Sequence, residues 1–256
     1  QVRGLAGAGF SEIVLTGIHL GGYGYDLSPR ASLCELVRHI AGSGLISRLR
    51  LSSLDPREVT DELLEVMAGS EVICPHLHVC VQAGEDSILK KMRRNYSTKY
   101  FAQLITRARA KLPRAALGTD VIVGFPGETE AAFGESLEFL AGLPLTYFHV
   151  FPYSVRRGTH AAAMSEQVPP FEKKERSRRA RELGAQKKHD FYRKQVGRRV
   201  SVLVEGSAAG EPNLLKGYSR NYLPVLLRGD SDLVHREIGV RLRQWSDGSL
   251  WGEAEC

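Results

Sequence analysis

Cysteines are few in this sequence, and long apolar runs are missing. The four cysteines, Cys34, Cys74, Cys80 and Cys256, form no CxxC pair in a chain of 256 residues, which is long enough to fold without disulfides. No apolar stretch approaches the roughly 20 residues that cross a bilayer, and the opening QVRGLAGAGF lacks the apolar core of a signal peptide. Disulfide scaffolds and membrane anchors are therefore not expected. We predict a globular, soluble, cytoplasmic protein with buried thiols.

Positive charge is in excess, but it is unevenly distributed. The formal net charge is +6. Residues 172–199 hold 12 lysines and arginines against four acidic residues, which leaves 23 basic and 25 acidic residues in the rest of the chain. Such a cluster favours a polyanionic partner, with nucleic acid as the first candidate. The alternative is a solvated helix face.

Strand and helix patterns alternate through the first 155 residues. Apolar, β-branched runs predict buried strands at 12–17, 48–54, 76–84, 117–125 and 146–154. Between them, helix-period segments begin after Ser32, after Pro56 and at Ser97 or Thr98, and a last one ends before Pro144. This alternation predicts parallel βα units whose helices cover the outside of an open sheet or barrel.

The carboxyl ends of these strands are rich in small and hydrogen-bonding residues. Ligands of βα folds bind at such ends. Any one of these residues also fits a turn, but the five ends together predict a rim that binds a small polar ligand. The ends are Thr16-Gly17, Ser52-Ser53, Gln82 to Gly84, Asp120 with Gly124, and Tyr153-Ser154.

A long polar helix and several short strands follow Pro169-Pro170. The helix pattern contains Gly184, whose low helix propensity makes it the weakest position, and we interpret the helix as a connector between two domains. From Arg198 onward, period-two runs separated by turn residues predict a small antiparallel β-barrel. We therefore predict three parts: a first barrel portion at 1–168, a basic connector helix at 169–196 and the small barrel at 197–256.

Five phrases in order carry a resemblance to a known family: EIVLTGIHLGGYG, LRLSSLDP, LHVCVQAGEDSILKKMRRNY, GTDVIVGFPGETE and FPYSVRRGTHAA. They resemble the radical S-adenosylmethionine methylthiotransferases. Within that family, TGIHLGGYG is most similar to the branch that modifies N6-threonylcarbamoyladenosine in tRNA. The tail with KGYSRNYLPVLL is similar to the TRAM domain, a small RNA-binding β-barrel. Several ordered motifs are a stronger signal than any single glycine pattern.

The resemblance implies an α/β fold: a partial TIM-like (βα) radical-SAM barrel lacking its first strand, followed by a TRAM-like β-barrel. It also implies S-adenosyl-L-methionine at the rim and two [4Fe-4S] clusters in the intact enzyme. Arg93 and Arg94 are expected to meet the cofactor carboxylate or a substrate phosphate. Cofactor contacts are assigned to Thr16, Gly17, Ser52, Ser53, Gln82, Asp120, Gly124, Phe148, Phe151 and Arg156.

The sequence departs from the family in its cysteines. Radical chemistry in the family needs a CxxxCxxC loop, and a second cluster uses three cysteines of an earlier domain; neither motif is present. Both precede the EIVLTG strand in the family, so we expect an N-terminally truncated chain that contains no cluster ligands and is inactive by itself. A zinc site at Cys74, His76 and His78 is not expected, because alternate strand residues share a face only as a pair.

The activity implied for the intact enzyme is methylthiolation at C2 of N6-threonylcarbamoyladenosine, with the tRNA anticodon stem-loop as partner. Two alternatives stay open: a methylthiotransferase acting on isopentenyladenosine tRNA or a ribosomal protein, and a non-catalytic RNA-binding module. Cationic and ring side chains suit phosphates and exposed bases, although we expect Tyr218 or Tyr222 to pack the barrel instead. RNA contacts are expected from Lys187, Lys188, Arg193, Lys194, Tyr218, Arg220, Asn221 and Tyr222.

Overall fold

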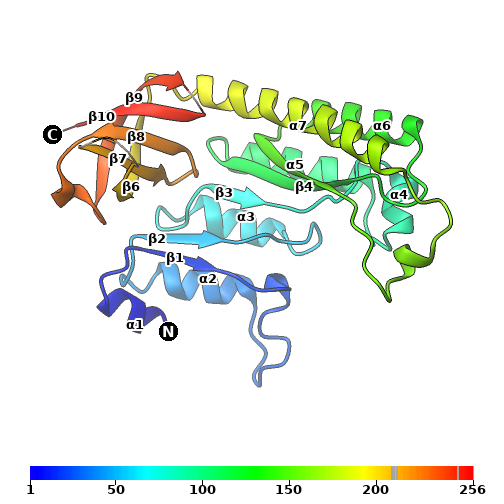
Figure 1. Ribbon diagram of the computed structural model, residues 1–256. Coiled ribbons are helices and arrows are strands. Elements are labelled where there is room, and N and C mark those ends of the chain that lie inside the picture. Colours follow the sequence, from blue (N-terminus) through cyan, green and yellow to red (C-terminus); the bar gives the residue numbers. More distant parts are fainter. Residues whose placement is uncertain (209–210, 212, 247, 256) are drawn as a thin grey trace.

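The computed structural model describes residues 1–208, 211, 213–246 and 248–255. Two regions are visible in Figure 1: a parallel sheet with helices, and a small β-barrel at the end of the chain. Of the four cysteines, Cys256 lies outside the described residues. No described helix is both long and apolar enough to cross a bilayer.

The first region contains five parallel strands, which confirm the five predicted runs in shortened form. β1 pairs with β2, while β3, β4 and β5 form a second group in that order. Single parallel bridges, Leu49 to Ile73 and Leu54 to Val79, join the two groups. The strands therefore lie side by side in chain order, as an open sheet. Their bounds are β1 (Glu12–Leu15), β2 (Arg48–Leu51), β3 (His76–His78), β4 (Ala116–Val123) and β5 (Tyr147–Pro152).

Side-chain caps begin several of the helices, which confirms the predicted starts at Ser32 and Ser97 and adds caps at Thr60 and Thr129. Ser32 and Glu35 form a reciprocal capping box, and Thr60, Ser97 and Thr129 each accept a backbone N–H three residues further on. Their apolar faces share one core with the strands. The helices are α1 (Val2–Gly7), α2 (Leu33–Ala41), α3 (Asp61–Ala68), α4 (Asp86–Lys91), α5 (Thr98–Lys111), α6 (Glu130–Gly142) and α7 (Pro170–Arg193).

The predicted connector is a packed helix. α7 lies against β5, β4 and α6, and Ala180 and Gly184 are buried along it. A Cβ atom on Gly184 would lie 3.2 Å from the ring of Phe148, so glycine permits the close approach of helix and strand. The expectation that Gly184 is a weak point of a free connector is therefore corrected. The boundaries at 168 and 196 stay a prediction.

The last region is a closed five-stranded barrel in the order β10-β8-β7-β6-β9. Four neighbouring pairs are antiparallel, but β8 and β10 run parallel, which corrects the expectation of a purely antiparallel barrel. Closure causes this exception, because it brings the last strand beside one that runs the same way. The strands are β6 (Arg199–Ser207), β7 (Leu214–Ser219), β8 (Pro224–Arg228), β9 (Glu237–Ser246) and β10 (Ser249–Ala254).

Candidate functional site

The parallel sheet has one apolar face and one polar face. Successive strand residues point to opposite sides, and Leu49 and Leu51 of β2 are buried in the core shared with the helices. Arg48 and Arg50 therefore point the other way. We call this second side the polar face. The same alternation gives it Glu12, Val14, Thr16, Arg48, Arg50, Ser52, His76, His78, Gly118, Asp120, Ile122, Tyr147, His149 and Phe151.

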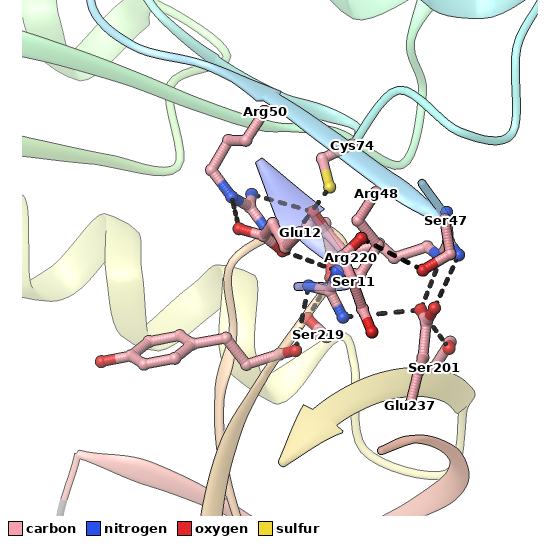
Figure 2. Close-up of polar contacts among 12 residues, drawn as sticks. Ser11, Glu12, Ser47, Arg48, Arg50, Cys74, Ser201, Ser219, Arg220 and Glu237 are labelled. Atoms are coloured by element: carbon pink, nitrogen blue, oxygen red, sulfur yellow. Dashed lines mark hydrogen bonds and ion pairs between the residues drawn. The ribbon is translucent and has the colours of Figure 1, made fainter. Parts of the chain in front are cut away.

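The amino end of the polar face is a buried ion network (Figure 2). Arg48 Nε donates to Glu12 Oε2 at 2.6 Å, and Arg50 Nε donates to Glu12 Oε1 at 2.8 Å. The Arg48 side chain is completely buried. Burial by itself would raise the pKa of Glu12, but the two guanidinium groups outweigh it and hold that pKa below its ordinary value. Glu12 is therefore a fixed anion that pairs with both arginines, and Glu237 lies 3.5 Å from Arg48 as a second carboxylate.

The same network holds the small barrel against the sheet. Arg48 Nη2 donates to the Tyr218 carbonyl at 3.1 Å, and Arg50 Nη1 donates to the Arg220 carbonyl at 3.0 Å. The Arg220 guanidinium pairs with Glu237 at 2.8 and 2.9 Å. The contacts join the barrel to the amino ends of β1 and β2, opposite the rim where a cofactor is expected (Figures 1 and 2).

Asn221 and Tyr222 belong to the same docking contact. Asn221 is buried and donates to the Arg114 carbonyl at 3.2 Å. The Tyr222 ring lies 4.9 Å from the rings of both His76 and Tyr218, with the Arg50 guanidinium 4.7 Å from its centre. These side chains and Arg220 have partners within the chain, while Tyr222 stays 45% exposed, so the predicted RNA contacts stay a proposal.

A hydrogen-bonded series crosses the middle of the polar face. His76 Nε2 lies 2.7 Å from the Tyr147 hydroxyl, which lies 3.1 Å from His78 Nδ1. His78 Nε2 lies 3.0 Å from Asp120 Oδ1, and His149 Nδ1 lies 3.2 Å from the same oxygen. The series runs from the buried His76 to the exposed His149. We call these five residues the histidine series.

Burial sets the ionisation of several groups here. It lowers the pKa of His76 to about 3 and, with the Asp120 charge, raises the pKa of Cys80 to about 12. Burial would raise the pKa of Asp120, but the hydrogen bond and charge of His78 outweigh it and the pKa lies below the ordinary value. The Cys80 thiol donates to Asp120 Oδ2 at 3.3 Å. Asp120 is thus an ionised acceptor for three neighbours.

The rim keeps polar side chains that are not paired within the chain. Thr16, Ser52 and Gln82 form no side-chain hydrogen bond with any residue that the structure describes. Gln82 has a φ of 69°, while its backbone pairs with Asp120 and Ile122 at 3.0 and 2.8 Å. A left-handed, non-glycine residue held between strands is typical of binding sites. These three positions keep their predicted cofactor role as a proposal.

Other predicted cofactor residues are placed differently. Phe148 is buried on the apolar face beside Gly184, so it cannot flank an adenine from the polar face, and that assignment is corrected. Phe151, on the polar face, is half exposed. Gly124 has a φ of 71°, but its N–H donates to Glu128 Oε2 at 2.6 Å and Lys173 occupies the space beside it. Gly124 therefore shapes a turn packed against α7.

The remaining assigned residues lie at or near strand ends. Gly17, Ser53 and Arg156 are exposed, and nothing in their contacts tests the predicted role. Arg93 and Arg94 line a cavity of about 520 Å³ that also contains Asp55. Arg94 lies 3.9 Å from the Asp55 carboxylate. The mixed charge of this cavity does not favour an anion.

The basic helix uses much of its charge internally. Lys187 Nζ donates to the Ala141 and Leu143 carbonyls at 2.9 and 2.8 Å and so closes the end of α6. Lys188 lies over the Tyr192 ring at 5.3 Å. Arg193 and Lys194 are exposed and have no side-chain partner within the described part of the chain. Arg193 and Lys194 are thus accessible to phosphates, as is the exposed Lys188, whereas Lys187 is engaged with α6.

The thiols do not form a cluster site. Cys34 lies on α2 beside the Thr60 hydroxyl, Cys74 lies 4.0 Å from Glu12, and Cys80 bonds to Asp120. Burial raises the pKa of all three thiols, whereas an iron–sulfur cluster needs gathered thiolates. The described cysteines therefore do not fit a [4Fe-4S] cluster. The unpaired rim groups do fit the amine, carboxylate and ribose hydroxyls of S-adenosylmethionine.

Sequence reasoning missed the most connected residues of the polar face. His149 and Tyr147 received no role, and Glu12, Arg48 and Arg50 were not singled out. A period-two series was present in each strand, as in HLHVCVQ and YFHVF, and it predicts which side chains share a face. His78, Asp120 and His149 also form the group that could hold a metal ion, with ligand atoms within 4.8 Å of one another.

Comparison with known proteins agrees with this arrangement. Residues 2–140 match the family model of the Radical SAM superfamily. The threonylcarbamoyladenosine tRNA methylthiotransferase MtaB of Bacillus subtilis (strain 168) is 38% identical over 247 residues, which are 94% of this chain and 54% of that protein. A tRNA-2-methylthio-N(6)-dimethylallyladenosine synthase of Carboxydothermus hydrogenoformans is 36% identical over 244 residues, 95% of this chain and 56% of that protein.

Solved structures support the fold alone. Coproporphyrinogen III oxidase (HemN) from Escherichia coli, a Radical SAM enzyme, aligns with a TM-score of 0.55 at 18% identity and covers 69% of this chain and 40% of its own. The chain spans about half the length of the curated relatives it matches. From the family model and the similarity along nearly its whole length, the chain belongs to the radical SAM superfamily and, within it, to the methylthiotransferase family.

Proposed function

We propose that this chain is the part of a tRNA methylthiotransferase that binds S-adenosylmethionine and positions the target nucleoside. The proposed product is 2-methylthio-N6-threonylcarbamoyladenosine beside the anticodon, with the tRNA anticodon stem-loop as substrate. Relatives named for threonylcarbamoyladenosine and for dimethylallyladenosine support methylthiolation of tRNA. The choice between these two substituents rests on the polar face.

The polar lining of that face carries the proposal. An isopentenyl group offers only apolar surface, whereas a threonylcarbamoyl group carries a carboxylate, a hydroxyl and a urea. His149 lies at the exposed end of the hydrogen-bonded line formed with Tyr147, His78 and Asp120, and its Nε2 has no partner among the described residues, so an apolar substituent would cover this nitrogen without pairing it. Because desolvated polar groups are costly unless paired, this surface favours the polar substituent.

The roles of the chain follow from its layout. Thr16, Ser52 and Gln82 would hold S-adenosylmethionine at the rim, and that cofactor supplies the methyl group when it is bound. Arg193 and Lys194 would meet tRNA phosphates. The small barrel, which we propose to be TRAM-like, is fixed at the opposite end of the sheet by Arg48 and Arg50.

Nucleoside mass analysis of tRNA tests the proposal. A strain lacking the gene should lose 2-methylthio-N6-threonylcarbamoyladenosine and accumulate the precursor, and the full reading frame should restore it. If that strain lost methylthiolated isopentenyladenosine instead, isopentenyladenosine in tRNA would be the substrate. Unchanged tRNA would contradict the proposal and direct attention to a ribosomal protein or to a non-catalytic RNA-binding role.

We also propose that residues 1–256 alone have no radical activity, because their described thiols lie apart. After iron and sulfide reconstitution, the purified chain should cleave no S-adenosylmethionine, while the product of the full reading frame should. Cleavage by the chain alone would overturn this part of the proposal.

A further inference from the structure

The histidine series places five ring and carboxylate groups in one hydrogen-bonded line, and its proton positions can be worked out from its buried end. His76 is 6% exposed and has no carboxylate among its hydrogen-bond partners, so the cost of burying an unpaired charge keeps its ring neutral, with a single N–H. Its Nδ1 is buried without a partner, while its Nε2 lies 2.7 Å from the Tyr147 hydroxyl. Because an orphaned buried N–H is rarer than an unsatisfied acceptor, the proton belongs on Nε2.

This assignment sets the direction of the next bonds. His76 Nε2–H donates to the Tyr147 oxygen, so the single Tyr147 hydroxyl proton is free to donate to His78 Nδ1. His78 then carries its proton on Nε2 and donates it to Asp120 Oδ1. Each donor meets an acceptor, and the line ends at an ionised carboxylate.

A metal ion at His78, Asp120 and His149 would require the reverse direction. A metal needs the lone pair of His78 Nε2, which moves the His78 proton to Nδ1 and makes Tyr147 an acceptor from it. Tyr147 would then donate to His76 Nε2, and the His76 proton would sit on the buried, unpartnered Nδ1. The hydrogen-bond count therefore favours the series without a metal.

His149 is the exposed terminus of this line. Its Nδ1–H donates to Asp120, and its ring lies 5.3 Å from the His78 ring and 6.4 Å from the Phe151 ring. Its side chain is 59% exposed, and Nε2 has no partner among residues 1–208, 211, 213–246 and 248–255. In the neutral form of the ring, an Nδ1–H that is held by Asp120 leaves Nε2 as the acceptor.

We propose that His149 is a substrate-binding residue that accepts an N–H of the target base, or of its N6 substituent, at Nε2. Asp120 is the positioning residue that orients the ring, and Tyr147 with His78 and His76 fixes Asp120. This inference deepens the proposed function, since it rests on a modified adenosine entering the polar face. The ligand class is a purine nucleoside with a hydrogen-bond donor at N6.

Binding of a synthetic anticodon stem-loop that carries N6-threonylcarbamoyladenosine tests His149 directly. In the product of the full reading frame, His149→Leu should weaken binding about tenfold, the value of one lost hydrogen bond to a desolvated acceptor. His39→Leu, at an exposed histidine of α2, is the matched control and should leave affinity unchanged. Equal affinities for His149→Leu and wild type would overturn the inference.

Nitrogen NMR of the histidine rings gives a readout independent of turnover. In residues 1–256, His76 and His78 should both show the Nε2–H form, and Tyr147→Phe should remove the hydrogen bond at His78 Nδ1. A protonated Nδ1 on His78, or one retained zinc ion per chain, would overturn the inference in favour of a metal site. If tRNA analysis shows no methylthiolation but binding still depends on His149, the proposed function fails and the binding site stands.

Discussion

The two ends of the polar face use similar residues for different purposes. At the amino end, Arg48 and Arg50 share the Glu12 carboxylate as an ion-pair partner and also bond to the small barrel. At the rim, Thr16 and Gln82 have no side-chain partner among the described residues. Buried charges that are paired hold structure together, whereas unpaired polar groups at strand ends are available to a ligand.

The comparison teaches that positive charge alone does not show which surface of this chain is available to a ligand. Arg220 is a cation in the small barrel, yet its guanidinium pairs with Glu237 and donates to the backbone carbonyl of Glu71. Arg193 is one of many cations in a helix, yet it is exposed. Partners, rather than residue type, separate a structural arginine from a binding one.

The largest expected effect is at the amino end. Arg48→Met should lower the free energy of unfolding by about 3–5 kcal/mol, because it leaves Glu12 and Glu237 with less positive charge in a buried place. Chemical denaturation measures the change. Arg38→Met removes an exposed pair with Glu62 and should lower the free energy of unfolding far less. Equal decreases for the two variants would contradict the claim that the buried pair stabilises the fold more than the exposed one.

A second substitution tests the middle of the polar face. A methyl group at Gly118 would overlap the Tyr147 ring, so Gly118→Ala should cost about 1–3 kcal/mol and shift the histidine series. Thermal unfolding and the ring NMR described above both report it. Gly134→Ala, in open space on α6, should instead stabilise by about 0.5–1 kcal/mol. If Gly118→Ala left the free energy of unfolding unchanged, the Tyr147 ring would be free to move away from the added methyl group.

Acid should loosen the amino end. The pKa of Glu12 lies below its ordinary value of 4.5, so its stabilising contribution is fully present above that value and is lost as the pH falls through the lowered pKa. Hydrogen exchange at the contact between sheet and barrel should therefore increase below about pH 4.5. Glu12→Gln should abolish this part of the pH dependence; a variant with the wild-type profile would assign it to another carboxylate.

The smallest expected effect concerns the basic helix. Arg193→Glu with Lys194→Glu should weaken tRNA binding several-fold and flatten its salt dependence, because two phosphate contacts are lost. Filter binding at several salt concentrations measures both. Arg178→Ala, whose guanidinium already pairs with Glu175 and Glu182, should change binding less. If Arg178→Ala lost as much tRNA affinity, arginines that are paired within the chain would also contribute to binding.

The sequence predicted the elements better than their contacts. Caps at Ser32, Thr60 and Ser97 act within four residues, and local signals of this kind can be read directly. The packing of Phe148 on α7 and the pairing of Arg220 with Glu237 were not predicted, because these partners are distant in the chain. Periodicity indicates the face of a strand but not the element that covers it.

Local patterns by themselves determined five strands in parallel order, their helices and the polar strand ends, since hydrogen-bond geometry and alternation act over a few residues. The tertiary structure alone decided that Arg48 meets Glu237 across 189 positions, that α7 packs on β5, and that His149 joins Asp120 and His78. Those contacts depend on how the sheet brings distant strands together and where the small barrel docks. The sequence therefore determined the family and the polar strand ends, while the tertiary structure decided which charged side chains are paired in the interior and which stay exposed.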